Sequence, residues 1–67
     1  MKKTVRINDG TVIELNTRKT IRQGAFIGYI TIITDNRGHR LETFHVSDVK
    51  PRLAMDSAYV RFIKEYY

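Results

Sequence analysis

The fold is decided by residues 25–34, which read Ala-Phe-Ile-Gly-Tyr-Ile-Thr-Ile-Ile-Thr. β-Branched and aromatic side chains dominate this stretch, and they favour the half-buried surface of a pleated strand. Because alternate side chains of a strand point to opposite faces, the stretch has two apolar faces. One face carries Phe26, Gly28, Ile30 and Ile32. The other carries Ile27, Tyr29, Thr31 and Ile33. We therefore expect one face to fill the interior of a small barrel and the other to lie under a helix, with Gly28 marking a bend or a close backbone approach.

Turn residues separate this strand from its neighbours. Asn8-Asp9-Gly10 lies between two strand-like runs, residues 4–7 and 11–15. Asp-Gly between such runs is typical of a hairpin, because Gly accepts the positive φ that the turn requires. Residues 35–38 predict a second turn, and residues 39–46 predict the partner strand. After Ser47-Asp48, a short last strand is expected over residues 49–52, with Pro51 at an edge position.

Residues 16–24 read as an exposed loop. They are polar, they carry Arg18, Lys19 and Arg22 without an acidic residue, and they end in Gly24. Ile21 is expected to turn inward as an anchor for this loop.

The C-terminal residues, about 56–66, predict an amphipathic helix. Asp56 or Ser57 can cap its first turn, since either side chain accepts a hydrogen bond from a free backbone N–H. A stripe with the 3.6-residue period of a helix follows, made of Tyr59, Phe62, Ile63 and Tyr66. The stripe is expected to cover the outer face of the sheet. Alternatively, the helix docks into a partner, with Tyr59, Phe62, Tyr66 and Tyr67 as the interface.

Length and composition exclude several classes of protein. With 67 residues the chain makes one small domain, residues 1–67, and it has no Cys for a disulfide or a thiolate metal site. Its longest apolar stretch, residues 25–33, is too short for a membrane helix, and no apolar signal segment follows Met1-Lys2-Lys3. A cytoplasmic protein without a membrane contact is expected. Twelve Lys and Arg against seven Asp and Glu give a formal charge of +5.

The order of these parts resembles the Sm-like and SH3-like small barrels. The resemblance is carried by residues 5–10, the long bent hairpin after them, and residues 43–52, Thr-Phe-His-Val-Ser-Asp-Val-Lys-Pro-Arg. It implies a mainly β fold, a five-stranded barrel over residues 4–52, here with a C-terminal rather than an N-terminal helix. In bacterial Sm-like proteins a His at the end of the fourth strand belongs to the RNA site, and His45 stands at a similar place.

The cations are the best candidates for a binding function. Cations that follow a phosphate backbone gain affinity by releasing condensed counterions. The loop cations are joined by others along the chain, so the candidate nucleic-acid-binding set is Arg18, Lys19, Arg22, Arg37, Arg40, Lys50 and Arg52. Tyr29 is a candidate for base stacking, whereas Phe26 and Phe44 are expected in the core. The hypothesis requires that these cations share one face; otherwise they only keep the domain soluble.

Catalysis and metal binding find little support. His39 and His45 are six residues apart on one expected strand, about 20 Å of backbone. His45, Ser47 and Asp48 contain the residue types of a triad, but neighbouring side chains point apart. We therefore expect a non-catalytic nucleic-acid-binding module, for RNA or DNA, without cofactor or metal. The alternatives are a small protein-interaction module, such as a regulator or inhibitor from a phage or mobile element, and an oligomeric structural component.

Overall fold

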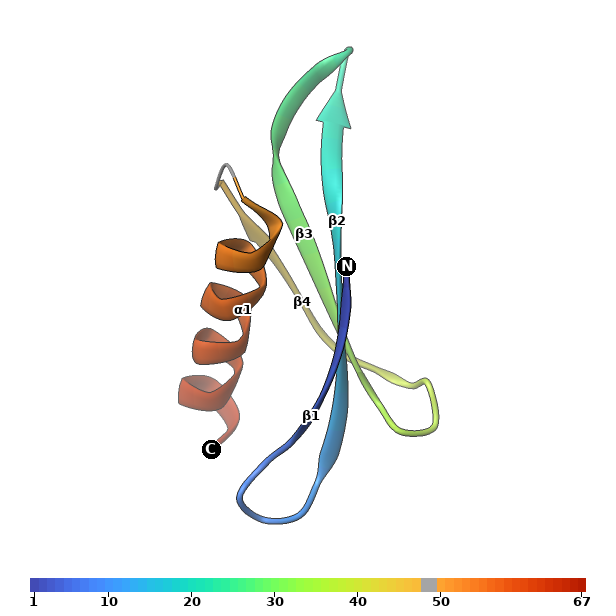
Figure 1. Cartoon of the computed structure of the whole chain (residues 1–67), viewed down its shortest axis with the longest axis vertical. Coiled ribbons are helices and arrows are strands. Elements are labelled where there is room, and N and C mark those ends of the chain that lie inside the picture. Colours follow the sequence, from blue (N-terminus) through green and yellow to red (C-terminus); the bar gives the residue numbers. More distant parts are fainter. Residues whose placement is uncertain (48–49) are drawn as a thin grey trace.

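The computed structural model describes residues 1–47 and 50–67, and it has four antiparallel strands followed by one helix (Figure 1). The elements are β1 (Lys2–Arg6), β2 (Val12–Arg22), β3 (Ala25–Asp35), β4 (Arg40–Val46) and α1 (Pro51–Tyr66). The strands form one open sheet in the order β1-β2-β3-β4. The expectation of a mainly β fold with a C-terminal helix is confirmed. Within the described residues, no helix is long and apolar enough to cross a membrane.

The first hairpin forms where the sequence predicts it. The N–H of Gly10 donates to the carbonyl of Ile7 at 2.9 Å, and the N–H of Ile7 donates to the carbonyl of Thr11 at 2.8 Å. The Asp9 carboxylate accepts the N–H of Thr11 at 2.9 Å. Gly10 has a φ of 90°, which the turn requires and which a side chain would strain. The turn fixes the register that pairs Val5 with Ile13.

The expected loop over residues 16–24 is wrong, because β2 continues to Arg22. The reversal needs only Gln23 and Gly24, both at positive φ, as in the two-residue turns that match the twist of a hairpin. Thr and Ile residues within this polar segment favour a strand, and β3 offers them a partner over its whole length. Ile21 is 63% exposed and is not an inward anchor. The end of the β2–β3 hairpin projects beyond α1 (Figure 1).

The core lies between α1 and one face of the sheet. It contains side chains from three strands, the first turn and the helix: Ile7, Ile13, Leu15, Ile33, Phe44, Met55, Ala58 and Phe62. Within it the hydroxyls of Thr17 and Thr31, which are direct partners across β2 and β3, hydrogen-bond to each other at 2.7 Å. We call this side of the sheet the covered face. Burial of its apolar side chains is the main source of stability for so small a domain.

The helix begins earlier than expected, and the fifth strand and closed barrel are not found among the described residues. Pro51 and Arg52, assigned by sequence to an edge strand, form the first turn of α1; Val49 lies outside the described residues. Pro suits a first helical turn, because its missing N–H would have no helical partner there. Lys50, in an extended conformation, takes the N-cap place that was expected for Asp56 or Ser57. The sheet therefore ends at β1 and β4.

The buried stripe of α1 is shifted relative to the expected one. It consists of Ala54, Met55, Ala58 and Phe62. The small Ala54 and Ala58 let the helix approach the sheet closely, and of the four residues of the expected stripe only Phe62 is buried. Tyr59 and Ile63 are half-buried beside the core. Tyr66 is exposed, and its hydroxyl donates to the Glu42 carboxylate on β4 at 2.6 Å.

Gly28 makes the close backbone approach that its position predicts. Its φ is 126°, and a Cβ placed on it would lie 2.6 Å from the carbonyl oxygen of Val46. The end of β4 can therefore approach β3 this closely only because this residue has no side chain.

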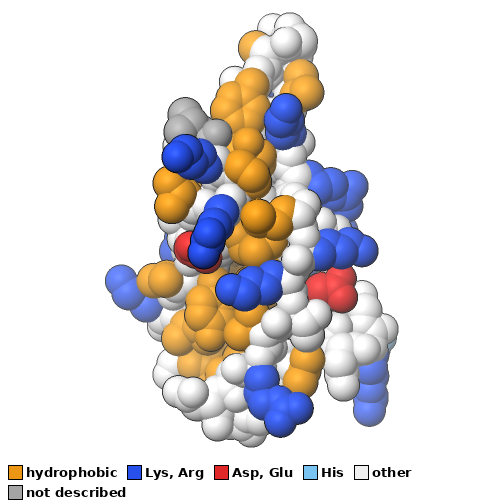
Figure 2. Space-filling model, viewed as in Figure 1, with side chains coloured by type: hydrophobic (Ala, Val, Ile, Leu, Met, Phe, Trp, Pro, Cys, Tyr) orange, Lys and Arg blue, Asp and Glu red, His pale blue; other side chains and the backbone are white. Residues whose placement is uncertain are grey.

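One helix does not cover the whole sheet. Among the described residues, α1 packs on β2, β3 and β4 but not on β1. Figure 2 shows a band of hydrophobic side chains along the long axis of the molecule, with Lys and Arg side chains on both of its sides.

Candidate nucleic-acid interface

The face of the sheet opposite α1 is open and carries most of the net charge. Strand alternation and the pairing register place on it the side chains of Lys2, Thr4, Arg6, Val12, Glu14, Asn16, Arg18, Thr20, Arg22, Ile30, Ile32, Thr34, Arg40, Thr43 and His45. We call this the open face. It holds five Lys and Arg, all exposed, and one carboxylate, so it carries +4 of the chain's formal +5.

The cations of the open face come from three strands. Lys2 stands on β1 opposite Asn16, and Arg18 follows two residues later on β2. Arg22 lies farther along the same strand, about 13 Å from Arg18 along the backbone. These three cations form a run without an acidic residue, from the middle of the sheet to the end of the hairpin. We call them the arm-side cations.

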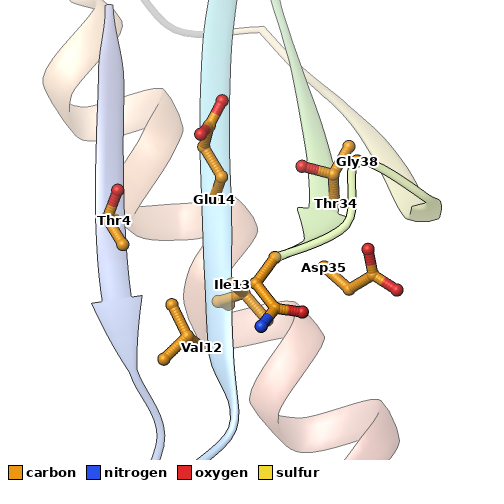
Figure 3. A pocket seen from close by; sticks show the side chains of 8 residues that line it. Thr4, Val12, Ile13, Glu14, Thr34, Asp35 and Gly38 are labelled. Carbon is orange, nitrogen blue, oxygen red and sulfur yellow. The ribbon is translucent and has the colours of Figure 1, made fainter.

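Glu14 interrupts the charge at the other end of the open face. It lies between Thr4 of β1 and Thr34 of β3, where a pocket of about 400 Å³ opens (Figure 3). The helix lies behind the sheet in this view, so the pocket belongs to the open face. Arg6 and Arg40 lie to either side of it. A carboxylate repels phosphate, so the arm-side cations are the better half of the face for a polyanion.

The acids do not neutralise these cations in pairs. Among residues 1–47 and 50–67, and leaving Lys50 aside, no Arg or Lys forms an ion pair with a carboxylate within 4.0 Å. Asp35 accepts the backbone N–H groups of Arg37 and His39 and lies 3.4 Å from the His39 ring. The His39 hydrogen bond is the main cause that lowers the pKa of Asp35. The Thr11 hydrogen bonds lower the pKa of Asp9 in the same way.

The structure divides the sequence-predicted binding set. Arg18, Arg22 and Arg40 share the open face. Lys19 points to the covered face, beside Phe26 and Tyr29. The others lie in the β3–β4 turn and at the start of α1; they are Arg37, Lys50 and Arg52.

Sequence reasoning missed Lys2 and Arg6. Their spacing was the available signal: Lys2, Thr4 and Arg6 alternate along a strand whose Asp-Gly turn fixes its register against β2.

Among the described residues, no Tyr or Phe ring lies on the open face. Tyr29, proposed to stack on bases, is on the covered face with 6% of its surface exposed. Phe26 was expected in the core but is 47% exposed, and its ring packs against Tyr29 at 5.2 Å. Phe44 is buried as expected, under the guanidinium of Arg61. His45 does lie on the open face, beside Ile30 and in the same row as Arg18.

The residues of the expected partner interface on α1 do not form one exposed surface, because some of them are buried. Phe62 is in the core and Tyr59 is half-buried. The Tyr66 hydroxyl donates a hydrogen bond to Glu42. Tyr67 is 58% exposed, with its ring 6.0 Å from that of Phe62.

Comparison of the chain with protein-family models, with curated proteins and with solved structures finds no match. In the part of the chain that the structure describes, no three His, Asp or Glu side chains gather as metal ligands would.

Proposed function

We propose that the open face binds nucleic acid without catalysis, chiefly through contacts of its cations with phosphates. The observation that carries the proposal is the segregation of charge: five exposed cations and one carboxylate share a face that α1 leaves uncovered. The side chains of Ile30 and Ile32 on β3 are half-buried and lie between the cations of β2 and Arg40 of β4.

The driving force is the release of counterions from the phosphate backbone. Each neutralised phosphate adds about 0.9 to the slope of log affinity against log salt for duplex DNA, and about 0.7 for a single strand. The arm-side cations would supply a slope of about 2 to 3 by themselves. Without Tyr or Phe on the open face, binding is expected to depend little on base sequence.

Arg18 and Lys19 are neighbours on β2 with side chains on opposite faces, so substitutions at these two residues test the proposal. Binding of a fluorescent oligonucleotide, single-stranded or duplex, is measured at several salt concentrations for the native chain, for the single variants Arg18→Gln and Lys19→Gln, and for one double variant. The double variant Arg18→Gln/Arg22→Gln is expected to lose about 2 from the salt slope and to bind at least tenfold more weakly near physiological salt. Lys19→Gln, on the covered face, is the matched control and is expected to keep most of the slope.

Three results would overturn the proposal. They are the absence of binding by the native chain at low salt, binding that salt does not alter, and a loss in Lys19→Gln as large as that in Arg18→Gln alone.

A further inference from the structure

A groove runs along the covered side of the sheet, between β1 and the first half of α1. It has a volume of about 280 Å³ and is lined by Met1, Lys2, Lys3, Arg52, Met55 and Asp56. We call it the β1–α1 groove. It exists because a helix, about 10 Å across, is narrower than a sheet of four strands spaced about 4.8 Å apart.

The floor of the groove is apolar. Met55 belongs to the core, and Met1 is 56% exposed at the mouth. Val5 of β1 and Tyr59 and Ile63 of α1 are not among the residues that line the groove, but they are half-buried and pack against the same core as Met55. Met55, Tyr59 and Ile63 follow at helical spacing, so one side of α1 is apolar for most of its length. These residues belong to the elements that border the hydrophobic band of Figure 2.

The rim of the groove is mainly basic. Lys3 points to the covered side of β1 because its strand partner is the buried Leu15. Arg52 faces it from the first turn of α1, and Asp56 is the acidic residue among those that line the groove. A ligand that fits must therefore present an apolar stripe to the floor and negative charge to the rim.

We infer that the β1–α1 groove binds an acidic amphipathic helix from another protein. A helix laid beside α1 would take the interaxial distance of 8–10 Å at which helices pack, and it would cover the part of the sheet that α1 leaves bare. A second copy of this chain is a poor occupant. Its own α1 carries three Arg and Lys against two acids, and two chains of charge +5 repel each other.

The inference is tested with synthetic peptides of about 18 residues. One peptide has Leu at helical spacing and Glu at the solvent-facing positions, and the second has Lys in place of every Glu. We expect the Glu peptide to bind and to shift the amide resonances of Lys3, Val5, Arg52 and Tyr59, and the Lys peptide to bind at least tenfold more weakly.

Charge-reversal variants of the protein distinguish binding in the groove from attraction by the overall net charge. Lys3→Glu/Arg52→Glu is expected to weaken binding of the Glu peptide at least tenfold. Arg37→Glu/Lys64→Glu makes the same change in net charge away from the groove and is expected to weaken it less than threefold. Circular dichroism checks that both variants fold.

The inference is overturned if the Glu peptide fails to bind the native chain at about 1 mM, or if the Lys peptide binds as well. Shifts confined to the open face, or equal losses in both double variants, would also overturn it. The inference is also overturned if the peptide binds as a β-strand along the edge of β1. Infrared spectra of an isotope-labelled peptide would show whether it is bound as a strand or as a helix.

Discussion

The two faces of the sheet are built from the same strands, residue by residue, yet they carry different kinds of side chain. On the covered face Ile13, Leu15 and Ile33 are at most 1% exposed. On the open face their immediate neighbours include Glu14, Asn16 and the half-buried Ile32. Stability is thus concentrated on one face and charge on the other. Substitutions of neighbouring residues can therefore separate folding from binding.

The largest effect on stability is expected from a matched pair on β3. Ile33→Ala removes a fully buried side chain and should lower the free energy of unfolding by about 2–5 kcal/mol. Ile32→Ala makes the same chemical change on the open face and should cost less than half as much, because Ile32 is only half-buried. Urea unfolding followed by circular dichroism gives both values. Equal losses would show that the open face is also covered.

Gly28→Ala tests the close approach of the end of β4 to β3. The new methyl group would clash with the carbonyl oxygen of Val46. The alanine would also be held at a positive φ, which L residues rarely adopt. A loss of about 1–3 kcal/mol is expected from this strain. Gly38→Ala is the control, since it has a similar backbone conformation but open space around it, and it should cost less. A Gly28 variant as stable as the native chain would contradict the close approach.

Two threonines on opposite faces are expected to respond differently to the same substitution. Thr31→Val leaves the buried Thr17 hydroxyl without its partner and should cost about 1–3 kcal/mol. Thr43→Val removes a buried hydroxyl that has no hydrogen-bond partner among the described residues, so it should be neutral or stabilising. Thermal unfolding of the two variants compares them directly. The comparison fails if the Thr43 variant is the less stable one.

The smallest effect is expected from the contact between α1 and β4. The Tyr66 hydroxyl is the main cause that lowers the pKa of Glu42 below its usual 4.5, and the same bond raises the pKa of Tyr66 above its usual 10.0. The bond therefore stabilises the fold between these two values. Its contribution is lost as the pH falls through the lowered pKa of Glu42, and again as the pH rises through the raised pKa of Tyr66.

Tyr66→Phe should therefore lower stability slightly near pH 7 and converge with the native chain in acid. Stability curves from pH 2 to 8 measure the difference. A difference that persists at pH 2 would assign the effect to packing rather than to this bond.

The sequence predicts the positions of most strands. It does not predict that the sheet stays open instead of closing into a barrel. The Asp9-Gly10 turn, the central strand and the mid-strand Gly28 follow from local rules of backbone conformation. The polar run around Arg18 predicts a loop as long as no partner strand is considered, but the long β3 pairs with it and makes it a strand. Pro51 fits an edge strand as well as a first helical turn, because both tolerate a residue without an N–H.

The candidate site was only partly predictable for the same reason. Which cations share a face depends on the strand register, and Arg18 and Arg22 belong to that register only because β2 runs without a break to Arg22. Arg18, Arg22 and Arg40 were found by charge alone, but Lys2 and Arg6 required the pairing of β1 with β2.

Residues 20–28 belong to the hairpin beyond the last pairings that β1 and β4 make with it. Two strands that pair only with each other are marginally stable in water. The amide protons of this end should therefore exchange with solvent well before those of Leu15 or Ile33. A ligand held by Arg22 would slow that exchange, so this segment can report binding at the hairpin tip without any change in the core.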